Sequence, residues 1–231
     1  MRFERYRGHM TELTRASFAA MVDHTLLAPT ATAEQIRSVC AEARQLNTAS
    51  VCVNGGWVAT VADELAGSAV RTCSVVGFPL GAMSATSMAA ETAQAVSDGA
   101  DEIDMVIPIG LVKSGDVDRA TDVVAAVRAA CPDATLKVIF ETAILTDDEI
   151  RSACSIAESA GADFVKTSTG FNAAGGATVA AVELMSGCVA DRLGIKASGG
   201  IRTLDDVTAM VAAGATRLGM SATVAVADQL G

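Results

Sequence analysis

The chain has 231 residues, of which 51% are hydrophobic but only 3% aromatic, and its formal net charge is −10. This length suits one α/β barrel domain, whose core would consist of aliphatic side chains. Because so acidic a chain has no basic field to attract a polyanion, we expect neither a nucleic acid nor a membrane as its partner.

Cysteine and histidine are too scattered to predict a metal site. The six cysteines include no C-x-x-C pair, and His9 and His24 are the only histidines. Buried free thiols are typical of a protein kept in a reducing cytoplasm, and the charged N-terminus lacks the apolar run of a signal peptide. We therefore expect a cytoplasmic protein without a metal or other cofactor.

Short runs rich in Val, Ile and Phe alternate along the chain with Ala-rich stretches whose apolar residues recur at helical spacing. The runs predict strands near residues 21–26, 50–53, 72–78, 102–108, 135–141, 163–168, 194–198 and 216–220. The stretches predict helices near residues 33–46, 56–66, 84–98, 115–130, 147–159, 176–191 and 204–212.

Eight strands with helices between them indicate a closed parallel (β/α)₈ barrel, or TIM barrel, that forms a single domain over residues 1–231. The first 17 residues are charged and lie outside the alternation, so we expect a helix that caps the bottom of the barrel. An open doubly wound sheet is the alternative. It normally has a Gly-rich turn after its first strand, whereas this chain has DHTLLAPTAT there.

Lysine is rare in this chain and unusually placed. Of only four lysines, Lys137, Lys166 and Lys196 lie in predicted strands, where lysine is disfavoured. Lys166 and Lys196 fall on neighbouring strands, which lie about 4.8 Å apart. Mutual repulsion and burial should then lower the pKa of one amine, and a neutral amine can attack a carbonyl to form a Schiff base. The alternative is that each lysine pairs with a carboxylate such as Glu141 or Asp101.

Two acidic residues share one face of the fourth predicted strand. Glu102 and Asp104 should point into the barrel, while Ile103 and Met105 point outward to the helices. Asp104 lies nearer the end of the strand where barrels place their active sites, and it is our candidate general acid or base. For Glu102 we favour an ion pair inside the barrel with Lys137.

The first strand holds another acid, Asp23, which is either a second inward carboxylate or simply the polar end of that strand. Glycines follow the last two strands. ASGGIRT contains Gly199, Gly200 and Arg202, and LGMSAT contains Gly219 and Ser221. Because barrels commonly bind phosphate at this position through backbone N–H groups, these residues predict a phosphate site.

Seven blocks, in order and over nearly the whole chain, resemble the deoxyribose-phosphate aldolases. They are DHTLL, VVGFPLG, GADEIDMVI, KVIFET, GADFVKTSTGF, GIKASGGIRT and GATRLGMS. The resemblance implies a metal-free Schiff-base aldolase on a (β/α)₈ barrel. Such an enzyme reversibly cleaves 2-deoxy-D-ribose 5-phosphate to D-glyceraldehyde 3-phosphate and acetaldehyde, so its partners are a phosphosugar and aldehydes. A homodimer or homotetramer is the assembly we expect.

The resemblance also implies roles for individual residues. Lys166 would form the Schiff base, Lys196 would perturb it and take part in proton transfer, and Asp104 would be the acid/base residue. Cys52 would lie near the substrate without being essential. The remaining residues expected to contact substrate or phosphate are Asp23, Thr25, Thr169, Gly170, Gly199, Gly200, Arg202, Gly219 and Ser221.

Two positions depart from the family pattern. Phe171 follows TSTG where some members have a lysine, and Pro108 follows DMVI where asparagine is common. The first leaves phosphate charge to be met by other groups, and the second affects the loop after the fourth strand. Two other functions remain open: another phosphosugar lyase or isomerase on the same barrel, and a non-catalytic phosphosugar-binding barrel.

Overall fold

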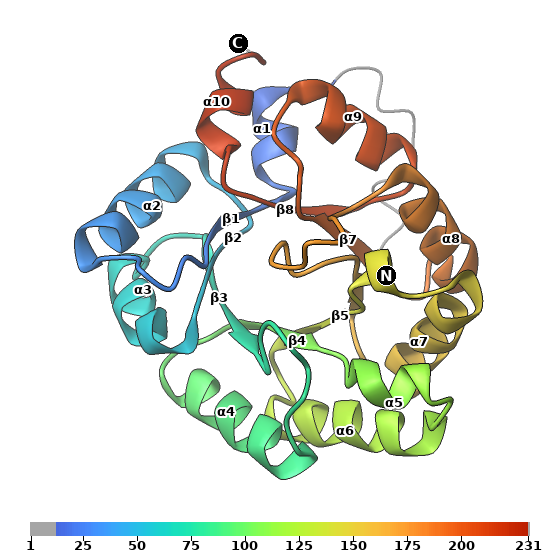
Figure 1. Ribbon diagram of the computed structural model, residues 1–231. Helices are drawn as coiled ribbons and strands as arrows, with labels where there is room; N and C mark the ends of the chain where they lie inside the picture. Colours follow the sequence, from blue (N-terminus) through green and yellow to red (C-terminus); the bar gives the residue numbers. More distant parts are fainter. Residues whose placement is uncertain (1–12, 231) are drawn as a thin grey trace.

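The computed structural model describes residues 13–230, and its strands close into a barrel (Figure 1). Each strand pairs in parallel with the next, and β8 pairs with β1. The strands are β1 (Val22–Leu26), β2 (Ser50–Val53), β3 (Arg71–Val76), β4 (Glu102–Val106), β5 (Thr135–Ile139), β6 (Phe164–Lys166), β7 (Gly194–Ser198) and β8 (Arg217–Met220). The predicted (β/α)₈ barrel is confirmed, and the open sheet is not what forms. That one domain accounts for all of residues 1–231 stays a prediction.

Helices surround the barrel as an outer ring (Figure 1). They are α1 (Arg15–Ala19), α2 (Ala33–Leu46), α3 (Val58–Glu64), α4 (Ala85–Ser97), α5 (Ile109–Lys113), α6 (Val117–Ala130), α7 (Asp147–Ser159), α8 (Val179–Val189), α9 (Leu204–Ala212) and α10 (Thr223–Ala227). Two 3₁₀ turns, η1 (Gly55–Trp57) and η2 (Thr142–Ile144), follow β2 and β5. Among the helices of this described part, none is long and apolar enough to cross a membrane.

Local capping chemistry explains which helices were predicted well. The helices α2, α7 and α9 begin and end at the predicted residues, and each follows a threonine, Thr32, Thr146 or Thr203, that forms a capping box. The helices α5 and α10 were not predicted. They are short, and neither Pro108 nor Ala222 at their N-caps gives a side-chain hydrogen bond.

The predicted N-terminal cap is only partly within the described residues. Residues 1–12 lie outside them, and α1 begins at Arg15 and continues two residues beyond the predicted end at 17. The helix is stabilised by a capping box between Thr14 and Ser17, and it buries Phe18 completely. It therefore leads directly into β1 and packs near α10, next to the C-terminal end of the described chain (Figure 1).

The main hydrophobic core lies between the barrel and its helices. Ile103 and Met105 of β4 are fully buried there, as predicted, and so are Leu136 and Val138 of β5. The residues between them point the other way, because side chains alternate along a strand. The barrel interior consequently receives the polar residues of these strands, including Asp104 and its neighbours.

One glycine tests how tightly the barrel is packed. A Cβ on Gly194, the first residue of β7, would lie 2.2 Å from the Phe164 ring. Gly194→Ala should therefore lower the free energy of unfolding by about 1–3 kcal/mol, because the ring or the strand must move. Gly187, exposed in α8, has no atom within 4 Å of such a Cβ, and Gly187→Ala should raise the stability by about 0.5–1 kcal/mol. Urea unfolding measures both, and a change of the same sign in the two variants would contradict this packing.

Candidate active site

A pocket of about 460 Å³ opens where β1, β6, β7 and β8 end. The sequence-predicted residues that line it are Thr25, Lys166, Thr169, Gly170, Gly199, Gly200, Arg202, Gly219 and Ser221. Four other predicted residues, Asp23, Cys52, Asp104 and Lys196, are fully buried within the barrel. The predicted site thus has two parts: an open pocket and a buried cluster of charged groups that meets the pocket at Lys166.

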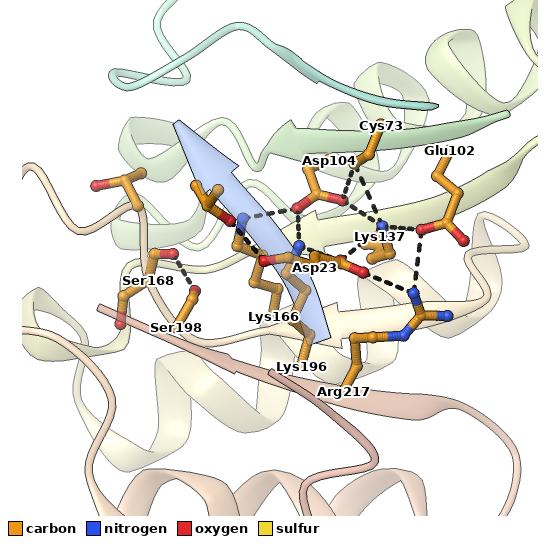
Figure 2. Close-up of polar contacts among 12 residues, drawn as sticks. Asp23, Cys73, Glu102, Asp104, Lys137, Lys166, Ser168, Lys196, Ser198 and Arg217 are labelled. Atoms are coloured by element: carbon orange, nitrogen blue, oxygen red, sulfur yellow. Dashed lines mark hydrogen bonds and ion pairs between the residues drawn. The ribbon is translucent and has the colours of Figure 1, made fainter. Parts of the chain in front are cut away.

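Asp104 joins the two lysines that were predicted from the sequence. Lys166 and Lys196 are register partners on β6 and β7, and their side chains converge on β4 inside the barrel (Figure 2). The same oxygen, Asp104 Oδ2, accepts hydrogen bonds from Lys166 Nζ at 2.7 Å and from Lys196 Nζ at 2.6 Å. The expected proximity of the two amines is confirmed, with a shared carboxylate between them.

The alternative partners considered for the lysines, Glu141 and Asp101, were wrong. Glu141 accepts hydrogen bonds from the backbone and side chain of Thr169. Asp101 accepts one from the backbone N–H of Thr72 at 2.9 Å. The principle behind the alternative was sound, because buried lysines do need carboxylates, but Asp104 supplies this charge for both amines.

Asp23 is the second inward carboxylate, and the reading of it as the mere polar end of a strand was wrong. Its Oδ2 contacts Lys196 Nζ and its Oδ1 lies 2.6 Å from an Arg217 guanidinium nitrogen (Figure 2). Burial alone would raise the pKa of Asp23, but Arg217, Lys137 and Lys196 together hold that pKa below its ordinary value.

Asp104 and Lys196 are kept ionised by the opposite charges around them. Burial acts to raise the pKa of Asp104, but the ammonium groups of Lys137, Lys166 and Lys196 hold it well below the ordinary value. For Lys196, burial acts to lower the pKa, and the carboxylates of Asp104 and Asp23 outweigh it and raise the pKa. At neutral pH, Asp104 is therefore a carboxylate and Lys196 an ammonium ion.

Lys137 links two carboxylates of the cluster, Glu102 and Asp104. Its Nζ lies 2.6 Å from Glu102 and 2.7 Å from Asp104 Oδ1. The predicted pair between Glu102 and Lys137 is confirmed, whereas the contact with Asp104 was not predicted. Because Lys137 occupies Oδ1 of Asp104, the other oxygen, Oδ2, faces Lys166 and Lys196. Glu102 also lies 3.4 Å from Arg217.

The cluster contains one more cation than carboxylates. Its carboxylates are Asp23, Glu102 and Asp104, and its cations are Lys137, Lys166, Lys196 and Arg217. With every group ionised the cluster has a net charge of +1, and it becomes neutral when one amine loses its proton. Within the described structure, Lys166 pairs with a single carboxylate oxygen, which it shares. Lys166 is also the lysine that lines the pocket.

Two cysteines lie beside Asp104. Cys52 and Cys73 are register partners on β2 and β3. A hydrogen bond from Cys73 lowers the pKa of the Cys52 thiol, and burial raises that of Cys73. Their sulfur atoms and an Asp104 oxygen lie close enough together to hold a metal ion. Lys137 Nζ already lies 3.4 Å from Cys73 Sγ and 2.7 Å from Asp104. An ion there would have to displace an ammonium group that the buried carboxylates need, so this set fits a metal poorly.

Glycine backbones shape the predicted phosphate side of the pocket. Gly170, Gly199 and Gly200 all have φ between 81° and 83°, which is accessible to glycine at little cost. A Cβ on Gly199 would lie 3.3 Å from the Gly170 Cα, so the loops after β6 and β7 touch. The N–H of Ala177 also donates to the carbonyls of Ser198 and Gly199, at 3.1 and 3.0 Å.

The two positions that depart from the family pattern have clear structural places. Phe171 lines the pocket, half exposed, and its ring meets the Phe78 ring edge-to-face with centroids 5.2 Å apart. Pro108 is the N-cap of α5 and so begins the unpredicted helix after β4. Among the pocket-lining residues, the charged side chains are Lys166 and Arg202, both cations.

Comparison with known proteins shows the family of this chain. The model of the DeoC/LacD family of aldolases matches residues 17–225. The chain belongs to the DeoC/LacD family of aldolases. Among family relatives, the deoxyribose-phosphate aldolase of Kocuria rhizophila is 54% identical, over 94% of this chain and 99% of the relative. Deoxyribose-phosphate aldolase 1 of Cutibacterium acnes is 57% identical, over 90% of this chain and 96% of the relative.

Solved structures show the same likeness. A putative deoxyribose-phosphate aldolase from Coccidioides immitis superposes with a TM-score of 0.90 at 42% identity, covering 93% of this chain and 85% of that one. A deoxyribose phosphate aldolase from Aeropyrum pernix, described as having a unique tetrameric structure, gives 0.86 at 29% identity, with 94% and 92% covered.

Arg217 closes the lower end of the charged cluster and was missed by sequence reasoning. Removing one partner of a buried ion pair typically costs about 3–5 kcal/mol, so Arg217→Met should lower the free energy of unfolding by about 3 kcal/mol or more. Adding Glu102→Gln should lower the stability further, because it removes the carboxylate that lies 2.6 Å from Lys137 Nζ and leaves three cations against two carboxylates.

The control for Arg217 is Arg192, whose ion pair with Glu158 lies at the surface. Arg192→Met should change the stability little, because exposed pairs contribute little. Urea unfolding of the four proteins measures the effect. Equal losses from Arg217→Met and Arg192→Met would show that the buried cluster does not stabilise the barrel.

Proposed function

We propose that Lys166 is the nucleophile through which this chain, a deoxyribose-phosphate aldolase, cleaves 2-deoxy-D-ribose 5-phosphate to D-glyceraldehyde 3-phosphate and acetaldehyde. The observation that carries this assignment is the position of the Lys166 amine. It lines the pocket and touches a carboxylate whose other contacts hold it ionised. Lys137 and Lys196 are fully buried, so Lys166 is the amine of the cluster that a substrate in the pocket can reach.

The reaction begins when neutral Lys166 attacks carbon 1 of the open-chain sugar. Loss of water gives a protonated imine, which withdraws electrons from the adjacent carbon. Removal of the proton from the 3-hydroxyl then breaks the bond between carbons 2 and 3, and its electron pair moves to carbon 2. Glyceraldehyde 3-phosphate leaves, the remaining enamine is protonated at carbon 2, and water releases acetaldehyde and the free amine.

Asp104 and Lys196 are suited to the proton transfers of this sequence. Asp104 begins as a carboxylate and can accept a proton, whereas Lys196 begins as an ammonium ion and can give one. They contact each other through Asp104 Oδ2 at 2.6 Å. With a water molecule carrying the proton to and from the substrate, the pair can take the 3-hydroxyl proton and return one to the enamine.

The phosphate of the substrate would lie at the other end of the pocket. Gly170, Gly199 and Gly200 provide close backbone approach there, and Arg202 provides positive charge. Because the charged groups that line the pocket are cations, an anionic sugar is favoured over a neutral one. Ser221 and Gly219 also line this side of the pocket. The Ser221 hydroxyl can hydrogen-bond to the phosphate, and Gly219 has no side chain that would fill the space.

A homodimer or homotetramer is our proposal for the assembly. The Aeropyrum pernix relative is described as a tetramer, and its likeness over 94% of this chain supports an oligomer here. A cytoplasmic location likewise remains our proposal, supported by the six free cysteines.

Borohydride trapping tests the assignment of Lys166. Reduction in the presence of acetaldehyde should place a stable adduct on Lys166, found by mapping the peptides. Lys166→Arg should lose both the adduct and turnover while keeping its fold, because a guanidinium stays protonated and cannot form an imine. An adduct on Lys196 or Lys137, or aldolase activity in Lys166→Arg, would contradict the proposal. A non-catalytic phosphosugar-binding barrel or an isomerase would give no adduct at all.

A further inference from the structure

Glu141 has an unusual backbone for its residue type. It lies two residues after the end of β5, with φ 61° and ψ 56°, and it is only 2% exposed. A non-glycine residue in this left-handed conformation is strained, at a cost on the order of 1–3 kcal/mol. Asn47 and Ala190, the other non-glycine residues with a positive φ in the described chain, end the helices α2 and α8. Glu141 instead precedes the 3₁₀ turn η2, and its side chain does not cap that turn, so its strain calls for another explanation.

Both carboxylate oxygens of Glu141 are used on one residue of the pocket wall. Oε1 accepts a hydrogen bond from the Thr169 backbone N–H at 3.2 Å, and Oε2 accepts one from the Thr169 hydroxyl. The Thr169 hydroxyl oxygen in turn accepts from the Phe171 N–H at 3.1 Å. Among the described residues, no cation pairs with this buried carboxylate through an ion pair. Its charge is met by hydrogen bonds from the loop that lines the pocket.

That loop ends at the glycine contact on the phosphate side. Gly170 lies between Thr169 and Phe171, and its backbone packs against Gly199 after β7. Backbone hydrogen bonds join the segment around Glu141 to the end of β6. The Phe140 N–H donates to the Lys166 carbonyl and the Thr142 N–H to the Thr167 carbonyl, both at 2.9 Å. Glu141 therefore lies where the end of β5 can set the position of the loop after β6.

We propose that Glu141 is a positioning residue that acts through Thr169 to hold Gly170 in place for the phosphate of the substrate. The inference rests on the proposed function for its substrate. The left-handed backbone at Glu141 is maintained because it turns the carboxylate toward Thr169. The Glu141 carboxylate accepts from Thr169, whereas Lys166 donates to Asp104, so the effect of Glu141 falls on recognition of phosphate and not on the chemical step.

Glu141→Gly tests this role cleanly, because glycine keeps the left-handed φ at little cost while the carboxylate is removed. The KM for 2-deoxyribose 5-phosphate should rise about tenfold or more, the size expected when hydrogen bonds to a charged group are lost. The kcat, the KM for unphosphorylated 2-deoxyribose and the rate of borohydride trapping with acetaldehyde should stay near wild type. Glu141→Gln keeps one acceptor for the Thr169 N–H and should recover part of the loss.

Two further variants provide a second test of the Thr169 contact and a control for the change of backbone. Thr169→Val removes the hydroxyl and should reproduce the rise in KM, without adding to it in the double variant with Glu141→Gly. If Glu141→Gly fails to fold, the KM values of Thr169→Val alone test the proposal. Ala190→Gly relieves a positive φ at the exposed end of α8 and should leave both KM values unchanged.

The results separate this inference from the proposed function. An unchanged KM for the phosphorylated sugar in Glu141→Gly, or equal losses on both sugars together with slower trapping, would overturn the positioning role. Absence of trapping in the wild-type protein would overturn the Schiff-base function itself. Wild-type trapping combined with a selective rise in KM would support both.

Discussion

The structure depends on a buried cluster of charges that the barrel encloses. Ionised groups are costly to bury unless each meets an opposite charge and further hydrogen bonds. Asp104 meets this condition by dividing its oxygens, one to Lys137 and the other to Lys166 and Lys196. The arrangement holds the carboxylate ionised and leaves the cluster with one cation in excess. An uncharged Lys166 removes that excess, so the state that neutralises the cluster is also the state that can attack an aldehyde.

The barrel places these groups by simple geometry. Alternation along β4 sends Glu102 and Asp104 inward and the apolar residues between them outward to the helices. Parallel register then sets Lys137 beside Asp104 and Lys196 beside Lys166. The loops beyond the strand ends add the phosphate side. The strands therefore position the amines of the reaction, and the glycine-containing loops at the strand ends shape the pocket for the phosphate.

Most of the fold and the principal site residues could be predicted from the sequence, because both follow from local patterns. The strands follow from apolar runs, the best-predicted helices from threonine caps, and the candidate lysines from their rarity and their strand positions. What could not be predicted depends on contacts across the barrel. The pairing of Arg217 with Asp23 joins residues 194 positions apart, and Arg217 looks in sequence like any surface arginine.

The role of Glu141 was missed for a related reason. Its left-handed backbone has no signal in the sequence, since KVIFET reads as a continuous strand, and its partner Thr169 is 28 residues away. The short helices α5 and α10 lacked a side-chain cap to announce them. The pKa directions of Asp104 and Lys196 likewise depend on how many opposite charges surround each group, which becomes countable only once the barrel is closed.

The pH dependence of borohydride trapping in wild type and in Lys196→Leu tests the charge balance most directly. Removing the Lys196 cation leaves the cluster neutral with Lys166 protonated, so trapping should require a higher pH in the variant. Lys113→Leu is the control, because Lys113 pairs with Glu149 at the surface, away from the cluster, and its profile should match wild type. A midpoint shifted to higher pH in Lys196→Leu alone is the predicted result. A shared midpoint in all three proteins would contradict the account, even if each of them traps acetaldehyde on Lys166.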